Sequence, residues 1–413
     1  MERSNTEATT RAAQPGQSQS NEIDLVRLRR YRGERIRAEL RARDYAAAVF
    51  CDAINVRYAT GSRNMQVWTL RNPARYAFVA AEGPTIMFEF GGCDHLVSDL
   101  ESIQEIRPAT SWFFFTSGPR MPQRAGRWAA ELAELVARHG GSNRRLAVDR
   151  VNPEGLLALQ SLGIEVRDGQ EVAERARAIK SPDEIACMSA AIAVCETALA
   201  QVRAAVRPGV PEIELLAILN AANIAGGGEY IETRLLTAGP RTNPWFQESS
   251  ERRIQAGELV ALDTDMIGPH GFFADMSRTF LCGDAKPTGA QRDLYRLAHE
   301  QVETNTALLR PGAGFREVME KSWAMPERFL EHRYMSLVHG AGLCGEYPYI
   351  PYPQDFEAKG YDGTIEENMT LCVESFIGDE RGGEGVKLEQ LVLVTKDGPR
   401  ALSNFPFDER LLG

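Results

Sequence analysis

Three aspartates form the densest group of side chains in this sequence that could do chemistry. Asp263, Asp265 and Asp275 stand in a stretch otherwise rich in strand-forming residues. Residues two apart on a strand face the same side, so we expect the carboxylates of Asp263 and Asp265 to point together. Asp275 follows a turn at Gly271 and would return beside them on the partner strand of a hairpin. By themselves, the three aspartates are equally typical of a loop around Gly268.

Two glutamates and a histidine further along the chain extend this group into a candidate metal site. Glu374 and Glu389 each lie inside an apolar run, where a carboxylate is costly unless it is paired or coordinated. A lone histidine is more often structural than metal-binding. The small residues around His339 would let the backbone approach a crowded site, however, and this favours a ligand. Oxygen-rich ligands with one imidazole suit iron, manganese or zinc.

A motif beside that histidine is rejected as a nucleotide site. Residues Gly340–Gly345 match GxGxxG, the pattern of a dinucleotide-binding turn. The segment Glu346–Pro351 follows it, and this proline-containing segment cannot open the helix that such a turn requires. We therefore exclude dinucleotide binding.

Composition narrows the function classes. Of 413 residues, 47 are basic and 57 acidic, for a net charge of -10, which argues against nucleic acid or an anionic membrane surface as the main partner. No apolar run approaches the ~20 residues of a membrane span. The seven cysteines include no CxxC pair, which indicates reduced thiols in a cytoplasmic protein and no thiolate zinc site. Residues 1–22 are polar and predict a disordered leader without a signal peptide.

The elements that must position these side chains fall into two groups. Strands interleaved with helices predict an α/β domain over residues 23–178. Its expected helices lie at 23–40, 126–138 and 153–162, and its strands at 46–51, 75–79, 85–90, 146–149 and 164–166. A capping box at Ser181–Glu184 predicts a helix to about Val206 and opens a second domain over residues 179–413. Its further helices are expected at 211–226, 287–309 and 315–332, and its strands at 258–266, 272–282, 369–377 and 386–395.

The order of the polar residues is similar to that of a known enzyme family. Asp, Asp, His, Glu and Glu, with the segments Asp275–Phe280 and His339–Gly342, resemble the pita-bread metalloenzymes, which include creatinase, prolidase, aminopeptidase P and methionine aminopeptidase. The resemblance covers nearly the whole chain after the leader. It implies an α/β N-terminal creatinase-like domain, an α+β C-terminal pita-bread (creatinase/aminopeptidase) domain, and a homodimer. It also implies two divalent metal ions, iron, manganese or zinc, held by Asp263 or Asp265 or both, and by Asp275, His339, Glu374 and Glu389.

Several departures make peptide hydrolysis the weaker interpretation. Peptidases of this family space their two aspartates eleven residues apart, whereas Asp263 and Asp265 precede Asp275 by twelve and ten. They also use two histidines besides the metal ligand. Phe246 stands near the place of one, and the segment Gly345–Tyr347 has no histidine at the place of the other. Without these groups, stabilisation of the transition state for peptide cleavage is lost.

The departures resemble one non-peptidase branch, the metal-dependent dimethylsulfoniopropionate lyases. The segments 227–236, 239–248 and 64–68, and the doubled aspartate at 263 and 265, carry this resemblance. It implies β-elimination of a small zwitterionic substrate to dimethyl sulfide and acrylate, with metals holding the substrate carboxylate. A sulfonium also needs an apolar, cation-friendly wall. The expected substrate-binding residues are Trp68, Trp245, Phe246 and Gly345, with Tyr334 a further aromatic candidate and plain core packing the alternative for the aromatics.

The base that would remove the α-proton does not follow from the resemblance. Lyases of the branch carry an aspartate, proposed as the base, where this chain has Gly345. Glu346 is adjacent, although a shift of one residue would aim it differently, and Tyr334 could act only if a cation lowers its pKa from ~10. These two are the catalytic candidates. Three alternatives therefore stay open: another small carboxylated cation as substrate, a Xaa-Pro dipeptidase or creatinase-type C–N hydrolase, and an inactive binding module.

Overall fold

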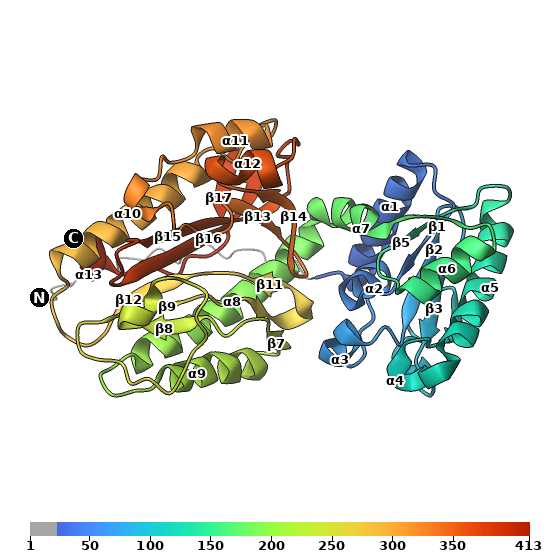
Figure 1. Ribbon diagram of the computed structural model, residues 1–413, viewed down its shortest axis with the longest axis horizontal. Helices are drawn as coiled ribbons and strands as arrows, with labels where there is room; N and C mark the ends of the chain where they lie inside the picture. The colour runs from blue at the N-terminus through green and yellow to red at the C-terminus, as the bar shows by residue number, and fades with distance from the viewer. Residues whose placement is uncertain (1–22) are drawn as a thin grey trace, which may run out of the picture.

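The N-terminal region combines one mixed sheet with helices packed around it (Figure 1). The computed structural model describes residues 23–413, so the leader predicted for residues 1–22 lies outside the described residues. The helices are α1 (Leu25–Ala42), α2 (Ala53–Thr60), α3 (Gln66–Arg71), α4 (Phe114–Ser117), α5 (Met121–Gly140), α6 (Pro153–Ser161) and α7 (Gly169–Ala178). The strands, in sheet order, are β4 (Glu105–Pro108), β3 (Thr85–Glu89), β2 (Tyr76–Ala80), β1 (Ala47–Phe50), β5 (Arg145–Val148) and β6 (Glu165–Asp168).

Strand β1 shows why this sheet is recognisable in the sequence only as short apolar runs. It pairs antiparallel with β2 and parallel with β5, and all four of its residues are buried. Ala48 and Phe50 join the core that contains α1, whereas Ala47 and Val49 join the core that contains α5. A strand covered on both faces needs apolar side chains throughout and shows no polar alternation.

The C-terminal region places three sheets between two groups of helices (Figure 1). The helices are α8 (Pro182–Ala205), α9 (Glu212–Ala225), α10 (Gly289–Thr306), α11 (Phe315–Lys321), α12 (Pro353–Lys359) and α13 (Glu409–Leu412). A five-stranded antiparallel sheet is formed by β14 (Gly345–Ile350), β13 (Val338–Ala341), β15 (Thr370–Gly378), β16 (Gly385–Thr395) and β17 (Gly398–Ala401). Two three-stranded sheets are formed by β12 (Arg278–Leu281), β9 (Leu259–Leu262) and β8 (Leu236–Ala238), and by β11 (Phe273–Ala274), β10 (Met266–Ile267) and β7 (Tyr230–Ile231).

Helix α8 joins the two regions and begins as the sequence predicts. The Ser181 hydroxyl accepts from the Glu184 backbone N–H, and the Glu184 side chain accepts from the Ser181 N–H, so the capping box is confirmed. By length and composition α8 could cross a membrane, which corrects the expectation that no apolar segment is long enough. It packs instead against α9, α1 and β11, and its buried side chains belong to the largest core.

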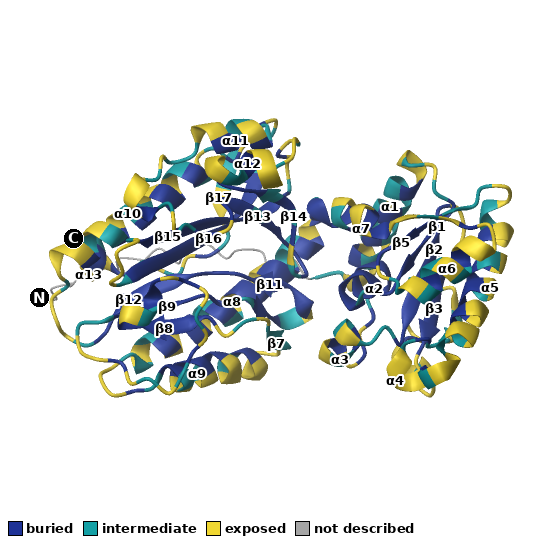
Figure 2. Cartoon of the chain, in the orientation of Figure 1, coloured by how far each residue is buried: buried dark blue, intermediate teal, exposed yellow. Residues whose placement is uncertain are grey.

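Two further expectations differ from the structure. The helix predicted over 315–332 is wrong beyond Lys321, where α11 ends with Ser322 as its C-cap. Pro326 follows four residues later, and a proline lacks the N–H that a continuing helix needs. Helix α7 escaped notice in the sequence, although Asp168 caps it by accepting from the Gln170 N–H. The central strands of the sheets, such as β1, β15 and β16, are buried, and the outer faces of the helices are exposed (Figure 2).

Candidate metal centre

The pairing of three neighbouring strands brings several predicted ligands to one face. His339 on β13 lies directly opposite Cys372 on β15, and Glu374 on β15 lies opposite Glu389 on β16. Residues directly opposite in antiparallel strands share a face, and so do residues two apart on one strand. The register therefore gathers these four side chains, with the unpredicted Cys372 among them.

The three aspartates reach the same place through a turn, and not along one strand as predicted. Strand β9 ends before Asp263, and Asp265 has a left-handed backbone with φ of 37°. The chain changes direction there, because β10 pairs with β11 and β7 in a different sheet from β9. The expected hairpin return of Asp275 is confirmed, since Met266 pairs with Ala274 immediately before it.

Ligand-type atoms of these side chains converge. One atom each from Asp263, Asp265 and Asp275 lie within 4.8 Å of one another, and one atom each from Asp275, His339, Cys372 and Glu389 do the same. Glu374 lies beside them, with its Oε1 3.1 Å from Nε2 of His339. We call this set the candidate metal centre; its members are Asp263, Asp265, Asp275, His339, Cys372, Glu374 and Glu389.

Unsatisfied oxygens indicate that a cation fits the candidate metal centre. Asp263 Oδ1, Asp275 Oδ1 and Glu389 Oε1 are buried and have no hydrogen-bond partner within residues 23–413. Buried polar atoms in native proteins are nearly always paired, and a buried carboxylate is costly unless a cation or hydrogen bonds compensate it. The donor set of carboxylates, one imidazole and one thiol is suitable for divalent iron, manganese or zinc.

A lysine ammonium group lies inside this ring of carboxylates. Lys387 Nζ is 2.5 Å from Oε2 of Glu374, 3.2 Å from Oδ2 of Asp263 and 3.8 Å from Oε2 of Glu389. It also donates to the Ser277 hydroxyl at 2.6 Å. Lys387 is fully buried, so its charge is compensated by the carboxylates and not by water. One positive charge among five carboxylates leaves an excess of negative charge that divalent cations would neutralise.

The excess charge shifts the ionisation of the centre. Burial raises the pKa of Asp265 to about 7, with a further contribution from neighbouring Asp263. Burial and the neighbouring Glu389 hold the pKa of Asp275 well above its ordinary value. Burial lowers the pKa of His339, but Glu374 outweighs it and raises that pKa to about 9. In the absence of a metal, protons and Lys387 thus carry part of the positive charge that the centre requires.

A cavity of about 890 Å³ opens onto the centre and is lined from both regions of the chain. Asp265, Asp275 and His339 form its metal-facing wall, and α7 of the N-terminal region contributes Glu174 and Arg175. A volume of this size fits the pockets in which small ligands bind. The candidate substrate site therefore lies between the two regions.

Gly345 lies at the edge of this cavity, with room beside it. A Cβ atom built on Gly345 would lie 3.9 Å from Cε1 and Nδ1 of His339, which is ordinary van der Waals contact. Gly345 is not one of the glycines with a left-handed backbone, so its φ does not require a glycine. An aspartate side chain at this position would thus be accommodated, and it would begin next to the imidazole.

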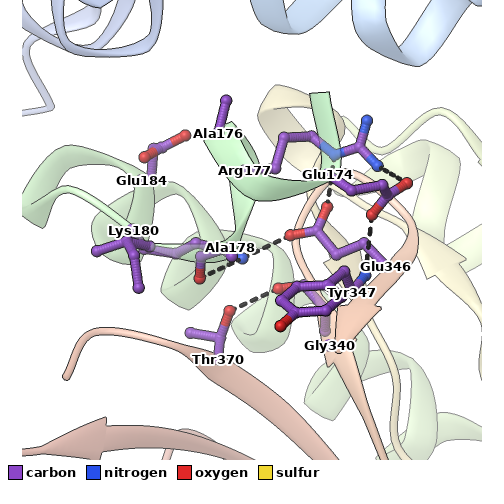
Figure 3. Close-up of polar contacts among 12 residues, drawn as sticks. Glu174, Ala176, Arg177, Ala178, Lys180, Glu184, Gly340, Glu346, Tyr347 and Thr370 are labelled. Carbon is purple, nitrogen blue, oxygen red and sulfur yellow. Dashed lines mark hydrogen bonds and ion pairs between the residues drawn. The ribbon is translucent and has the colours of Figure 1, made fainter. Parts of the chain in front are cut away.

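Glu346 points into an ion-pair network that joins the two regions (Figure 3). Its Oε2 accepts from Nε of Arg177 at 2.9 Å, and its Oε1 accepts from Nζ of Lys180 at 2.5 Å. Arg177 also pairs with Glu174 and with Asn55 of α2. Both carboxylate oxygens of Glu346 are thus engaged by buried basic side chains, and this geometry favours a structural role over the catalytic role predicted for Glu346.

The aromatic candidates separate into core and cavity residues. Trp245 is 6 % exposed and packs on Phe376 at 5.9 Å, which is the core-packing alternative. Tyr334 lines the cavity, and Phe246, which is 49 % exposed, stacks on it at 5.3 Å. Trp68 does not line the cavity and instead contacts Phe90, edge to face at 6.1 Å.

Tyr334 is also a poor candidate for the base. Lys387 Nζ lies 4.4 Å from the centre of its ring, which is the kind of nearby cation that its role required. Burial and the carboxylate of Glu374 nevertheless raise the pKa of Tyr334 well above its ordinary value. Tyr334 is better described as a residue of the cavity wall that stacks with Phe246.

Two residues of the site, Cys372 and Glu232, were missed in the sequence. Cys372 could have been found, because it precedes Glu374 by two residues and shares its strand face. Lys387 is recognisable in the sequence as the residue at the place where peptidases of the family often carry an arginine, two residues before Glu389, but its position among the carboxylates is not. Glu232 lines the cavity, and its peptide N–H donates to the Asp265 carbonyl. Only the turn at Asp265 brings Glu232 there, so no local pattern signals it.

Comparisons with known proteins agree with this geometry. Residues 186–396 match the model of metallopeptidase family M24. The chain is 40% identical over 395 residues to dimethylsulfoniopropionate lyase DddP of Roseovarius nubinhibens, covering 94% of this chain and 89% of the relative. It is 40% identical over 397 residues to the enzyme of the same name from Roseobacter denitrificans, covering 94% and 88%. A probable dipeptidase PepE of Mycobacterium tuberculosis is 26% identical over 254 residues, covering 60% and 64%.

Solved structures show the fold. A Xaa-Pro dipeptidase from Bacillus anthracis superposes with a TM-score of 0.73 at 19% identity, covering 92% of this chain and 99% of that one. The prolidase from Pyrococcus horikoshii superposes with a TM-score of 0.72 at 19% identity, covering 91% and 99%. The predicted combination of an α/β N-terminal domain and a pita-bread C-terminal domain is thereby confirmed. The position of the boundary at residues 178 and 179 stays a prediction. The family model and the near-full-length relatives together establish that the chain belongs to metallopeptidase family M24.

Proposed function

We propose that this protein is a metal-dependent C–S lyase that converts dimethylsulfoniopropionate to dimethyl sulfide and acrylate. The observation that carries the proposal is the 40% identity to two dimethylsulfoniopropionate lyases along 94% of the chain. The dipeptidase relative covers 60% of the chain at 26% identity. The site favours the lyase over the peptidase. Among residues 23–413, His339 is the one histidine that belongs to the candidate metal centre or lines the cavity, whereas peptidases of the family use two more.

The charge of the cavity suits the sulfonium end of a zwitterionic substrate. Among the described residues, its lining outside the candidate metal centre includes five carboxylates besides Glu346, and Arg175 is the one lysine or arginine. The five are Asp168, Glu171, Glu174, Glu232 and Asp362. Acidic side chains attract the cationic end of a zwitterion, and the rings of Tyr334, which lines the cavity, and Phe246, which stacks on it, supply the apolar contact that a sulfonium prefers.

Each part of the site has a proposed role. Two divalent ions, iron, manganese or zinc, would be held by the candidate metal centre, where they supply Lewis-acid binding of the substrate carboxylate and acidify its α-proton. Phe246 and Tyr334 would border the sulfonium end. We assign the proton acceptor to Glu232, because it lines the cavity and makes no ion pair in the described chain. Glu232 is exposed in the cavity, and partial desolvation there raises its pKa to about 6, close to the range in which a general base is effective.

The expected homodimer belongs to the same proposal. Met65 and Val67 beside Trp68, and Phe114 and Phe115 on α4, are exposed apolar side chains of the N-terminal region. Such a surface is typical of an interface. Trp68 contacts substrate only if a second copy brings it to the cavity. Light scattering of the purified protein tests the dimer, and the cytoplasm is the compartment that we expect.

The decisive experiment is product detection with metal-loaded protein. We expect dimethyl sulfide in the headspace over dimethylsulfoniopropionate, no product after chelation, and at least a hundredfold loss in Glu232→Gln, which keeps the shape and removes the base. Cleavage of a Xaa-Pro dipeptide without dimethyl sulfide would show a peptidase instead. The fold shared with Xaa-Pro dipeptidases makes that substrate the necessary comparison. Creatine and related small cations test the C–N hydrolase, and no turnover with any of them would indicate a binding module.

A further inference from the structure

A cysteine lies among the candidate metal ligands, although the family resemblance does not include it. Cys372 is fully buried on β15, directly opposite His339 and two residues before Glu374. Its Sγ belongs to a group with one atom each of Asp275, His339 and Glu389, all within 4.8 Å of one another. The Sγ atom thus lies beside the ligand atoms of the candidate metal centre, at the place where the main apolar core borders it.

A second observation indicates that a metal ion fits this group of side chains. Oδ1 of Asp275 and Oε1 of Glu389 are buried and unpaired in the part of the chain that the structure describes. These are the two carboxylates that share the group with the Cys372 thiol. Oxygen, nitrogen and sulfur donors converging on one point, with orphaned oxygens, are the pattern of a transition-metal site.

We propose that Cys372 Sγ is a ligand of one metal ion in the candidate metal centre. Binding forms a metal–sulfur bond, and the thiol proton leaves to solvent because the thiolate is the ligand form. Sulfur is a soft donor, whereas carboxylates are hard. Cys372 therefore biases one position toward zinc, iron or cobalt over manganese and magnesium. The inference rests on the proposed metal dependence but not on the lyase reaction.

The other cysteines provide matched controls. Cys187 on α8 is equally buried and belongs to the same apolar core as Cys372, but it is part of no ligand group among the described residues. A Cys187→Ser variant carries the same chemical change away from the centre. The Cys372→Ser variant replaces sulfur by oxygen at nearly constant volume, and circular dichroism shows whether each variant remains folded.

Cobalt(II) titration of metal-free protein tests the inference without any substrate. A sulfur ligand adds a thiolate-to-cobalt charge-transfer band in the near ultraviolet, whereas nitrogen and oxygen ligands give only the visible d–d bands. We expect the charge-transfer band in the wild type and in Cys187→Ser, and its loss in Cys372→Ser with the d–d bands retained. The preference for zinc over manganese should fall roughly tenfold or more in Cys372→Ser.

Each failure has a different reading. Cobalt binding by the wild type with d–d bands alone would overturn sulfur ligation and leave the metal centre of the proposed function intact. That result is available even if Cys372→Ser does not fold. Retention of the charge-transfer band in Cys372→Ser would assign the sulfur to another cysteine and also overturn the inference. Absence of bound cobalt from all three proteins would overturn the inference together with the proposed metal dependence.

Discussion

The ammonium nitrogen of Lys387 lies 2.5 Å from Oε2 of Glu374, inside the ring of carboxylates that we assign to metal ions. Burial disfavours this charge, but Asp263 and Glu374 outweigh burial and hold the pKa of Lys387 well above its ordinary value. Conversely, Lys387 lowers the pKa of Asp263 although burial opposes it. Lys387 is thus a permanent cation of the site, which offsets part of the repulsion before any metal binds.

Removing this cation should destabilise the metal-free protein. Lys387→Met keeps the length of the side chain and leaves buried carboxylates uncompensated, which costs about 3–5 kcal/mol. Urea unfolding with a chelator measures this loss, and added divalent metal should recover most of it by binding the folded state. Lys387→Arg, which keeps the charge, is the control. Equal stability of Lys387→Met and wild type without metal would show that the carboxylates are protonated instead.

Gly345→Asp should raise lyase activity. The position has room for the side chain 3.9 Å from His339, and a correctly placed general base contributes about 10²–10⁴-fold. We expect at least a tenfold rise in kcat for dimethyl sulfide release, with the fold retained. Gly345→Asn is the control, since it fills the same space without a base. An equal rise in Gly345→Asn would mean that the side chain acts by shaping the cavity.

Glu346 should prove structural. Glu346→Gln leaves the buried Lys180 without its carboxylate partner and Arg177 with Glu174 alone, so we expect a loss of about 3–5 kcal/mol in the free energy of unfolding. Glu171→Gln breaks a pair with Arg43 in which the glutamate side chain is 51% exposed, and such pairs contribute at most about 1 kcal/mol. Lost turnover in Glu346→Gln at unchanged stability would instead restore the catalytic role predicted from the sequence.

The two neighbouring aromatics should separate stability from binding. Trp245→Ala opens a cavity against Phe376 and should cost about 3–5 kcal/mol of stability. Phe246→Ala removes an exposed ring that stacks on Tyr334 and should raise KM several-fold with little loss of stability. Thermal unfolding and steady-state kinetics on both variants test this pair. A large loss of stability in Phe246→Ala would place it in the core after all.

Asp149 should make stability depend on pH. It accepts from the Cys51 N–H at 2.7 Å and from Asn55 Nδ2 at 2.9 Å, yet burial raises its pKa to about 6. The folded state therefore holds the proton more tightly than the unfolded chain, whose aspartates titrate near ~3.9. The stabilisation from this proton is complete below the unfolded pKa and is lost as the pH rises through 6. The total loss in the free energy of unfolding is about 3 kcal/mol.

The measurement is the difference in the free energy of unfolding between the wild type and Asp149→Asn, obtained by urea unfolding from pH 5 to pH 8. Contributions of the other titrating groups are common to both proteins and cancel in this difference. The stability of the wild type should fall relative to the variant up to about pH 6.5 and then run parallel to it. A constant difference across this range would show that Asp149 ionises normally in the folded protein.

The sequence by itself determined which residues could bind metal, because their types and order are local facts. Asp275, His339 and Glu374 were recognisable from one chain, as were the start of α8 at its capping box and the absence of peptidase histidines. Helix and strand signals depend on neighbours a few residues apart, so most of the predicted elements lie close to their observed ranges, whereas β13 and β14, which carry His339 and Gly345, had no predicted strand. The family and fold class followed from the same order of residues.

Tertiary structure decided how those residues meet. Cys372 enters the centre because β15 pairs in register with β13. Glu346 accepts from Arg177 and Lys180 because α7 and the segment that follows it bring these side chains to β14. The turn at Asp265 replaces a predicted strand and brings Glu232 to the cavity. Each of these contacts joins segments far apart in the chain, and their energies come from burial and charge compensation that no local pattern encodes.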